Sequence, residues 1–304
     1  MPTSPLLTRH GAVAGNGVDV DVADHYGDPL REQRVLLGEG GLVDRSHRGV
    51  LRVEGPDRLS WLHSLTSAHL EALPVGEVRE ALILSPHGHV EHHMVLRDDG
   101  EATWLTTEPQ TSETLTRYLD SMRFMLRVEV ADLSSSYAVM TQVLDDVASD
   151  ELVSREELER WVDAKSLPLV GHGAWEARRV AQRVPRLGFE TDHRTIPHEV
   201  GWIGVAVHLN KGCYRGQETV ARVHNLGRPP RRLVFGHLDG TSDVLAPAHT
   251  DIELDGRSVG FLGTALHHAE LGPIALAVIK RNVADDAALT VAGMAMRAER
   301  VVDA

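Results

Sequence analysis

The sequence holds a single cysteine, Cys213, in 304 residues, so no disulfide can form within the chain. It has no run approaching the 18 or more apolar residues of a membrane-spanning helix. Positive charge is also in short supply, with 31 Lys and Arg against 44 Asp and Glu and a net charge of −13. A general nucleic-acid binder needs clustered cations to neutralise phosphates, so we expect neither a nucleic-acid nor a membrane partner.

The N-terminal residues lack the basic region followed by an apolar run that marks a signal peptide. We therefore expect a cytoplasmic location. Lysine is scarce, since only Lys165, Lys211 and Lys280 occur. A small basic cluster of arginines surrounds Pro229 and Pro230, and its simplest interpretation is a solvated turn; its members are Arg228, Arg231 and Arg232.

Residues 211–220, with the sequence KGCYRGQETV, crowd ionisable and aromatic side chains around the only thiol. Two glycines flank the Cys-Tyr pair and allow a sharp turn or a close approach of the backbone. Lys211 and Arg215 lie two residues on either side of Cys213, so in an extended segment both would share its face. Nearby cations stabilise a thiolate and favour a nucleophile or metal ligand. The alternative is a small buried residue in a glycine-rich loop.

This segment resembles the signature of the YgfZ family of folate-binding proteins, which reads KGCYxGQE followed shortly by an Ala-Arg pair, here Ala221 and Arg222. Weaker similarity covers residues 53–96 and 186–200. The family is homologous to the T-protein of the glycine cleavage system, a tetrahydrofolate-dependent aminomethyltransferase. The resemblance implies tetrahydrofolate or a derivative as the ligand.

The resemblance also implies an α+β fold of three domains arranged in a ring, with the folate site at its centre and a C-terminal antiparallel β-barrel. On that basis, residues 1–50 and 138–228 form one discontinuous folate-binding domain. Residues 51–137 are an inserted α+β domain, and residues 229–304 form the barrel.

Local patterns agree with an α+β chain. Apolar spacing predicts helices over residues 57–70, 111–122 and 174–184, the last stopped by Pro185. Ser154 and Glu157 form the pattern of a capping box that opens another helix. After the Gly-Arg-Pro-Pro-Arg-Arg run, short apolar segments separated by turn residues predict the strands of a small barrel: 233–238, 251–254, 258–265, 274–279 and 289–291. Asp255-Gly256 is the strongest hairpin signal.

The chain departs from the transferase pattern at two places. T-proteins carry paired aspartates where this sequence has His92 and His93, and a pterin-anchoring glutamate where it has Ala181. Imidazole cannot supply the negative charge with which an aspartate stabilises a developing cation. Both changes disfavour a working aminomethyltransferase.

The histidines around residue 90 invite a metal interpretation. In a strand, His89, Glu91 and His93 would line one face, and two imidazoles with a carboxylate suit zinc or ferrous iron. The spacing matches no known ligand motif. A polar cavity wall explains the pattern with fewer assumptions, and simple surface exposure is the third interpretation, so no metal site is predicted here.

The resemblance and the residues together predict a tetrahydrofolate-binding accessory protein that acts with iron–sulfur client or assembly proteins in their assembly, maintenance or repair. Cys213 is the predicted reactive or ligand-handling group, and one cysteine cannot by itself hold a four-thiolate cluster. The predicted folate-binding residues are Lys211, Tyr214, Arg215, Gln217, Glu218, Arg222, Glu199 and His92. The alternatives are a folate-dependent one-carbon transferase or demethylase, and a binding module that does not use its thiol.

Overall fold

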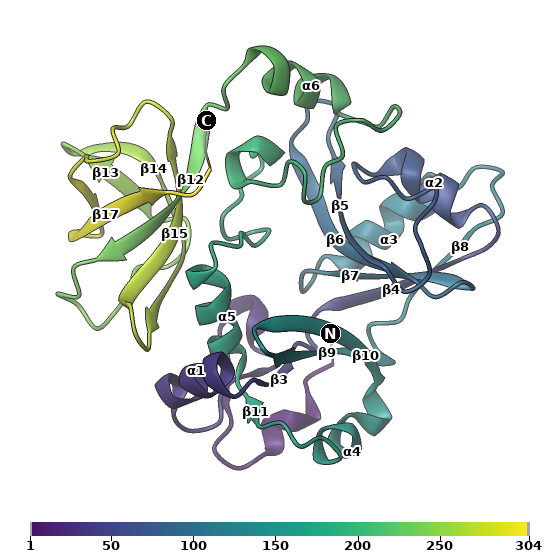
Figure 1. Ribbon diagram of the computed structural model, residues 1–304, viewed down its shortest axis with the longest axis horizontal. Coiled ribbons are helices and arrows are strands. Elements are labelled where there is room, and N and C mark those ends of the chain that lie inside the picture. The colour runs from purple at the N-terminus through teal and green to yellow at the C-terminus, as the bar shows by residue number, and fades with distance from the viewer. Residues whose placement is uncertain (1, 303–304) are drawn as a thin grey trace. The chain divides into compact units, whose positions relative to one another are not determined.

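The computed structural model describes residues 2–302, apart from the side chain of Leu226, and shows the mixture of helices and strands predicted from the sequence (Figure 1). The α-helices are α1 Pro29–Gly38, α2 Arg58–Leu65, α3 Ser112–Ser121, α4 Leu158–Asp163, α5 His172–Ala181 and α6 Gln217–Leu226. Short 3-10 helices cover Pro5–Thr8, Gly17–Asp19, Arg155–Glu157 and Pro197–Val200. No helix within residues 2–302 is both long enough and apolar enough to cross a membrane.

The chain forms two compact units. The first comprises residues 1–63, 69–80 and 94–178, and the second comprises residues 64–68, 81–93 and 179–304. The three-domain division remains a prediction.

The first unit contains a four-stranded sheet in the order β10-β9-β3-β11, where only β11 runs parallel to its neighbour. Its strands are β3 Gly41–Asp44, β9 Tyr137–Leu144, β10 Val147–Ser154 and β11 Leu169–Val170. A small ladder joins β1 Val13–Ala14 to β2 Ala23–His25. Alternate residues of β9, such as Ala138 and Met140, pack with Leu6 and Leu158 on one face, as the period of two of a strand requires.

A second sheet has the order β5-β6-β7-β4-β8. Its strands are β4 Gly49–Glu54, β5 Val78–Leu84, β6 Val90–Asp98, β7 Ala102–Thr107 and β8 Glu129–Asp132. Residues 81–93, which contain the end of β5, the connecting turn and the start of β6, belong to the second unit. This β5–β6 turn carries the histidines singled out in the sequence.

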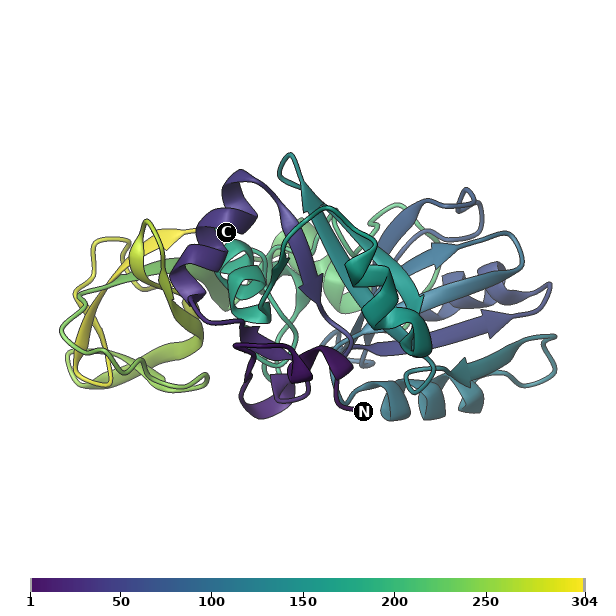
Figure 2. The same ribbon diagram turned by 90° about the horizontal axis from the view of Figure 1, so that it is seen from below.

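The C-terminal region is the predicted antiparallel barrel, closed because β12 pairs with both β15 and β17 (Figures 1 and 2). Its strands are β12 Arg231–Leu238, β13 Asp251–Leu254, β14 Arg257–His268, β15 Gly272–Lys280, β16 Leu289–Val291 and β17 Met294–Arg300. The predicted two-residue hairpin is confirmed. Asp255 and Gly256 have φ of 51° and 70°, the left-handed values that a type I′ turn needs at both central positions.

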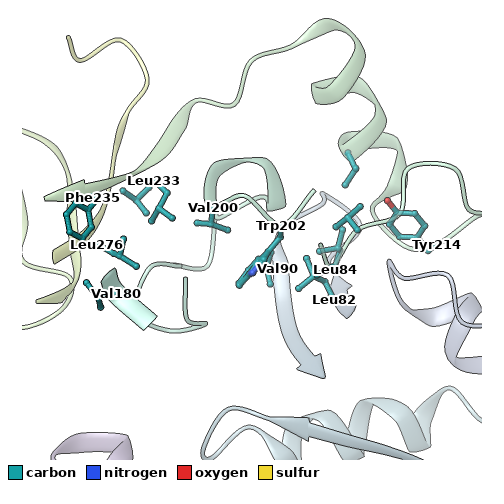
Figure 3. Packing of buried hydrophobic residues seen from close by; sticks show 14 of the residues in the cluster. Leu82, Leu84, Val90, Val180, Val200, Trp202, Tyr214, Leu233, Phe235 and Leu276 are labelled. Carbon is teal, nitrogen blue, oxygen red and sulfur yellow. The ribbon is translucent and has the colours of Figure 1, made fainter. Parts of the chain in front are cut away.

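Both faces of β12 and β15 are buried along residues 233–236 and 274–279, which explains why these stretches are continuously apolar. On β12, Val234 packs inside the barrel, whereas Leu233 and Phe235 pack in a cluster outside it. Figure 3 shows this outer cluster, in which Val200 lies toward the barrel residues and Trp202 lies beside Val90. The barrel wall therefore serves as part of the core that supports the β5–β6 turn.

Two of the three arginines in the cluster at the start of β12 do not lie in a solvated turn, and that interpretation was wrong for Arg231 and Arg232; Arg228 is exposed, as expected. The Arg232 side chain is 2 % exposed and donates to the carbonyl oxygens of Arg281 and Val283 and to Asp285. Arg231 is also largely buried and ion-paired. Sequence alone could not supply their partners, because these residues come from other segments of the chain.

Two helix predictions also need correction. Ser154 makes no side-chain capping hydrogen bond, since it is the last residue of β10 and pairs with Tyr137 before a 3-10 turn leads into α4. Helix α5 ends at Ala181, earlier than the predicted stop at Pro185, and Arg183 takes a left-handed φ of 62°.

Helix α6 begins at a close contact between backbones. Gly216 precedes it with φ of 82°, and a Cβ atom at this position would lie 2.6 Å from the carbonyl oxygen of Ser85 and 3.0 Å from Cα of Gly88. Gly212 has open space around its Cα, with nothing within 4 Å of an added Cβ. The two glycines of the 211–220 segment thus differ in what they can tolerate.

We predict that Gly216→Ala lowers the free energy of unfolding by at least about 1–2 kcal/mol, the typical cost of a left-handed side-chain-bearing residue. The clash with Ser85 adds to that cost. Gly212→Ala is the matched control and should be nearly neutral. Urea denaturation of both variants measures the difference, and equal stability of the two would contradict the contact.

Candidate functional site

The 211–220 segment packs on the β5–β6 turn within the second unit. Gly216 approaches Ser85 and Gly88, and a Cβ on Gly88 would in turn meet the Thr219 side chain at 2.8 Å. Residues 212–216 form neither helix nor strand, and α6 starts at Gln217. The segment is therefore a loop held against a hairpin, and no residue of it lies in a β-strand.

Lys211 is buried, and its ammonium group is fully engaged at the base of this loop. Nζ donates to the carbonyl oxygen of Thr66 and lies 5.1 Å from the centroid of the Tyr214 ring. The amide of Gln217 donates to the Lys211 carbonyl oxygen at 3.4 Å. A buried ammonium needs such partners to offset its desolvation, so Lys211 fixes the loop from inside.

Tyr214 is also buried, and its hydroxyl has no hydrogen-bond partner among the described residues. Burial raises the pKa of Tyr214 to about 12, so the hydroxyl stays neutral. A buried hydroxyl without a partner costs free energy unless something else binds it. Tyr214 therefore offers one polar atom to a ligand at the edge of the apolar cluster in Figure 3.

Arg215 forms an ion pair with Glu91 on β6, with N–O distances of 3.0 and 3.4 Å. Both side chains are about one-third exposed, so the pair adds little stability but orients the guanidinium. Glu91 thus has a partner in the loop, which leaves less reason to assign it to a metal.

Cys213 is exposed, which rules out the interpretation of a small buried residue. The two cations near it in sequence interact with other groups. Lys211 donates to the carbonyl oxygen of Thr66, and Arg215 forms an ion pair with Glu91. The accessible thiol at the tip of an anchored loop suits contact with a partner or ligand.

The remaining predicted residues of the segment lie on the first turns of α6. Gln217 is half-buried, whereas Glu218 and Arg222 are exposed. Their exposure leaves both charges accessible to a ligand or another protein.

Glu199, in contrast, is wholly buried and its carboxylate is engaged by Arg231 at 3.0 and 2.8 Å. Arg231 also donates to Asp192 at 2.6 and 3.0 Å. Burial acts to raise the pKa of Asp192, but the hydrogen bonds and charge of Arg231 hold that pKa well below its usual range. Glu199 therefore orients the 192–199 segment against the barrel, and its role in folate binding stays a prediction.

The imidazoles of His92 and His93, which the resemblance places where T-proteins have aspartates, are built into the packing. His93 stacks on Trp202 with ring centroids 5.0 Å apart and an interplanar angle of 4°. Burial lowers the pKa of His92 to about 4, so its ring is neutral at pH 7. Ala181 ends α5 and packs against the outer apolar cluster. Neither position supplies negative charge.

Two buried groups were not identified from the sequence. Both ring nitrogens of His198 are buried without a partner among the described residues, and burial, followed by the charge of His224, lowers its pKa to about 4. Glu190 is fully buried and accepts from Arg179 at 3.1 Å and from the backbone of Thr264 at 2.7 Å, which joins α5 to β14. No periodicity or motif in the sequence marks either residue, so their burial could not be predicted from it.

We predict that stability falls as the pH is lowered from about 6.5 towards 4. An unfolded histidine binds its proton near pH 6.5, whereas folded His92 and His198 resist it until about pH 4. The unfolded state therefore binds more protons in this window, and acid favours it. His92→Gln should flatten the decline in urea midpoint, whereas exposed His87→Gln should not; identical slopes for both variants would contradict the burial effect.

The chain is similar in sequence and in fold to several known proteins. Residues 4–143 match the GCVT N-terminal domain. A putative chloroplastic transferase of Arabidopsis thaliana is 27% identical over 73% of this chain and 60% of its own length. The tRNA-modifying protein YgfZ of Vibrio atlanticus is 31% identical over 45% of this chain and 44% of its own length. The matches therefore span about half of these relatives.

A mitochondrial iron-sulfur cluster assembly factor IBA57 homolog of Mycosarcoma maydis is 27% identical over 62% of this chain and 55% of its own length. The crystal structure of the glycine cleavage system aminomethyltransferase T from Bartonella henselae superposes with a TM-score of 0.82 at 15% identity, covering 97% of this chain and 95% of that one. The predicted α+β fold of the T-protein type is thereby confirmed. Residues 4–143 thus carry a GCVT N-terminal domain, and the chain is similar to YgfZ in sequence and to a glycine cleavage aminomethyltransferase in fold.

Proposed function

We propose that this protein binds a reduced folate, tetrahydrofolate or a derivative, and acts in the assembly, maintenance or repair of iron–sulfur proteins. The observation that carries the proposal is the 211–220 loop, in which an exposed thiol stands above a buried lysine and a buried, unpartnered tyrosine hydroxyl. Similarity to an iron–sulfur cluster assembly factor and to YgfZ also supports this proposal. Its expected partners are iron–sulfur client or assembly proteins.

A folate has a hydrogen-bonding pterin and an anionic glutamate tail, and the residues around the loop match these two parts. Arg222 is exposed on α6 and provides a cation for a carboxylate. Tyr214 provides a buried hydroxyl, and His92 a neutral, half-buried imidazole, for the pterin. Lys211 and Glu199 then act as positioning residues, because their charged groups are held by Thr66 and Arg231.

Cys213 is the group that would meet an iron–sulfur client. One thiolate supplies one ligand, so a cluster with four thiolate ligands needs the others from a second protein. Exposure at the end of a rigid loop permits such a shared, transient contact. We also propose that the chain has three domains and acts in the cytoplasm.

A folate-dependent aminomethyltransferase or demethylase is the alternative. The likeness of the whole fold to an aminomethyltransferase favours it. His92 and His93 count against it, because a stacked or desolvated imidazole cannot replace the charge of an aspartate, and lost preorganised charge commonly costs about 10²-fold or more in rate. Turnover of an aminomethyl donor at rates near those of a T-protein would select the alternative.

We predict that tetrahydrofolate raises the thermal midpoint of the purified protein, because a ligand that binds only the folded state stabilises it. Tyr214→Phe should leave the midpoint of the free protein unchanged or higher, since the hydroxyl has no protein partner. The variant should bind folate about 2–10-fold more weakly, the worth of one hydrogen bond. Calorimetry measures the binding.

Arg222→Ala should also weaken folate binding, whereas Arg257→Ala on the barrel strand β14 is the exposed control and should not. Absence of both a thermal shift and a calorimetric signal with saturating tetrahydrofolate would contradict the folate proposal. Unchanged affinity in Tyr214→Phe and Arg222→Ala would remove these residues from the site.

We predict that Cys213→Ala folds and binds folate like the native protein, because the thiol is exposed and contributes little packing. The same variant should fail to restore iron–sulfur enzyme activity in cells that lack the native protein. Gly212→Ala, a neighbouring change with open space around it, serves as the control and should restore activity. Full restoration by Cys213→Ala would favour a binding module that does not use its thiol.

A further inference from the structure

A second cluster of chemically active side chains lies in the first unit and has no part in the proposed folate site. Asp19 ends the 3-10 helix Gly17–Asp19, His47 lies in the turn between β3 and β4, and His172 is the first residue of α5. One ligand atom from each residue lies within 4.8 Å of the others. Three separate segments of the chain thus converge on one point.

The distances suit a metal ion with nitrogen and oxygen ligands. His172 Nε2 lies 3.6 Å from Asp19 Oδ1 and 3.7 Å from Glu176 Oε1, both longer than a normal hydrogen bond. Ligand atoms around a tetrahedral zinc, each about 2.0–2.1 Å from it, are separated by about 3.3 Å. The His47 Nε2 to Asp19 Oδ1 distance of 2.9 Å is a hydrogen bond and needs to open by a few tenths of an ångström.

The cluster is buried and its immediate surroundings are acidic. His47 is 1 % exposed and His172 is 5 % exposed. Asp24 lies close by, and its pKa is raised, first by burial and further by the charges of Asp19 and Glu176, although His25 opposes the shift. Carboxylates gathered in a partly dehydrated place favour a bound cation.

The two imidazoles of this cluster are close neighbours. Their rings meet edge to face with centroids 4.8 Å apart. Nε2 of His47 faces Asp19 and is the nitrogen offered to a metal, whereas Nδ1 of the same ring is buried and has no hydrogen-bond partner among the described residues.

We propose that Asp19, His47 and His172 bind one zinc ion. Two imidazoles and a carboxylate are ligands that zinc accepts, and a water molecule takes the fourth position of such a three-ligand site. The ion would fasten the N-terminal 3-10 helix and the β3–β4 turn to α5, and its binding free energy would add to the stability of the fold.

The test is a zinc titration of protein stripped with a chelator, read by competition with a chromophoric chelator and by the thermal midpoint. Cobalt in place of zinc gives a visible absorption band that reports a four-coordinate site. Asp19→Asn keeps an oxygen that can accept from His47 but removes the charge, so it tests the metal without removing that hydrogen bond. His172→Gln removes an imidazole.

The native protein should bind one zinc per chain and show a higher midpoint with zinc. Both variants should bind at least about 100-fold more weakly, since loss of an outer-shell partner alone costs 10–100-fold. His69→Gln is the control, because His69 belongs to an exposed group with His63 and Glu71 that also has ligand-like spacing. The proposal is overturned if the native protein binds no zinc, if Asp19→Asn binds as tightly as the native protein, or if His69→Gln abolishes binding.

Discussion

The guanidinium of Arg231 is the contact on which the arrangement of the second unit depends. It stands at the first residue of the barrel and holds Asp192 and Glu199 of the preceding loop. In the same loop, the carbonyl oxygen of Thr195 accepts from the backbone N–H of Val90 at the start of β6. A buried charge needs all its partners in place, because removing one leaves the other uncompensated. Arg231 thereby joins the barrel to the 192–199 loop, and that loop in turn is hydrogen-bonded to the start of β6, next to the β5–β6 turn.

The 211–220 loop rests on that turn and inherits its position. Gly216 allows the loop backbone to approach the turn closely, and Lys211 donates to the carbonyl oxygen of Thr66. The next residue, Ser67, accepts a hydrogen bond from the backbone of Leu82 and donates one to the carbonyl oxygen of Ala206. The loop is thus held from two sides by buried polar contacts. The thiol of Cys213, the predicted reactive group, is left exposed. Rigid support beneath an accessible group is the arrangement that a contact site requires.

Replacement of the transferase aspartates has a structural side as well as a chemical one. An aspartate cannot stack on Trp202 as His93 does, and a desolvated carboxylate at the place of His92 would need a compensating partner. The chain therefore has the fold of an aminomethyltransferase and uses the strand position of His93 for packing. Similar folds carry different functions because the chemistry resides in such positions.

The sequence by itself determined the elements whose signals are local. Five of the six barrel strands, β12 to β16, the Asp255-Gly256 hairpin and helix α3 follow from periodicity and turn chemistry, and the 211–220 motif carries the resemblance to the YgfZ family. Tertiary structure alone decided which charges are partnered. Arg231 was expected in solvent and is buried on Asp192 and Glu199, and Asp19 meets His47 and His172 from distant segments. Periodicity reports which face of an element is buried, whereas the partner of a buried charge depends on how remote segments fold together.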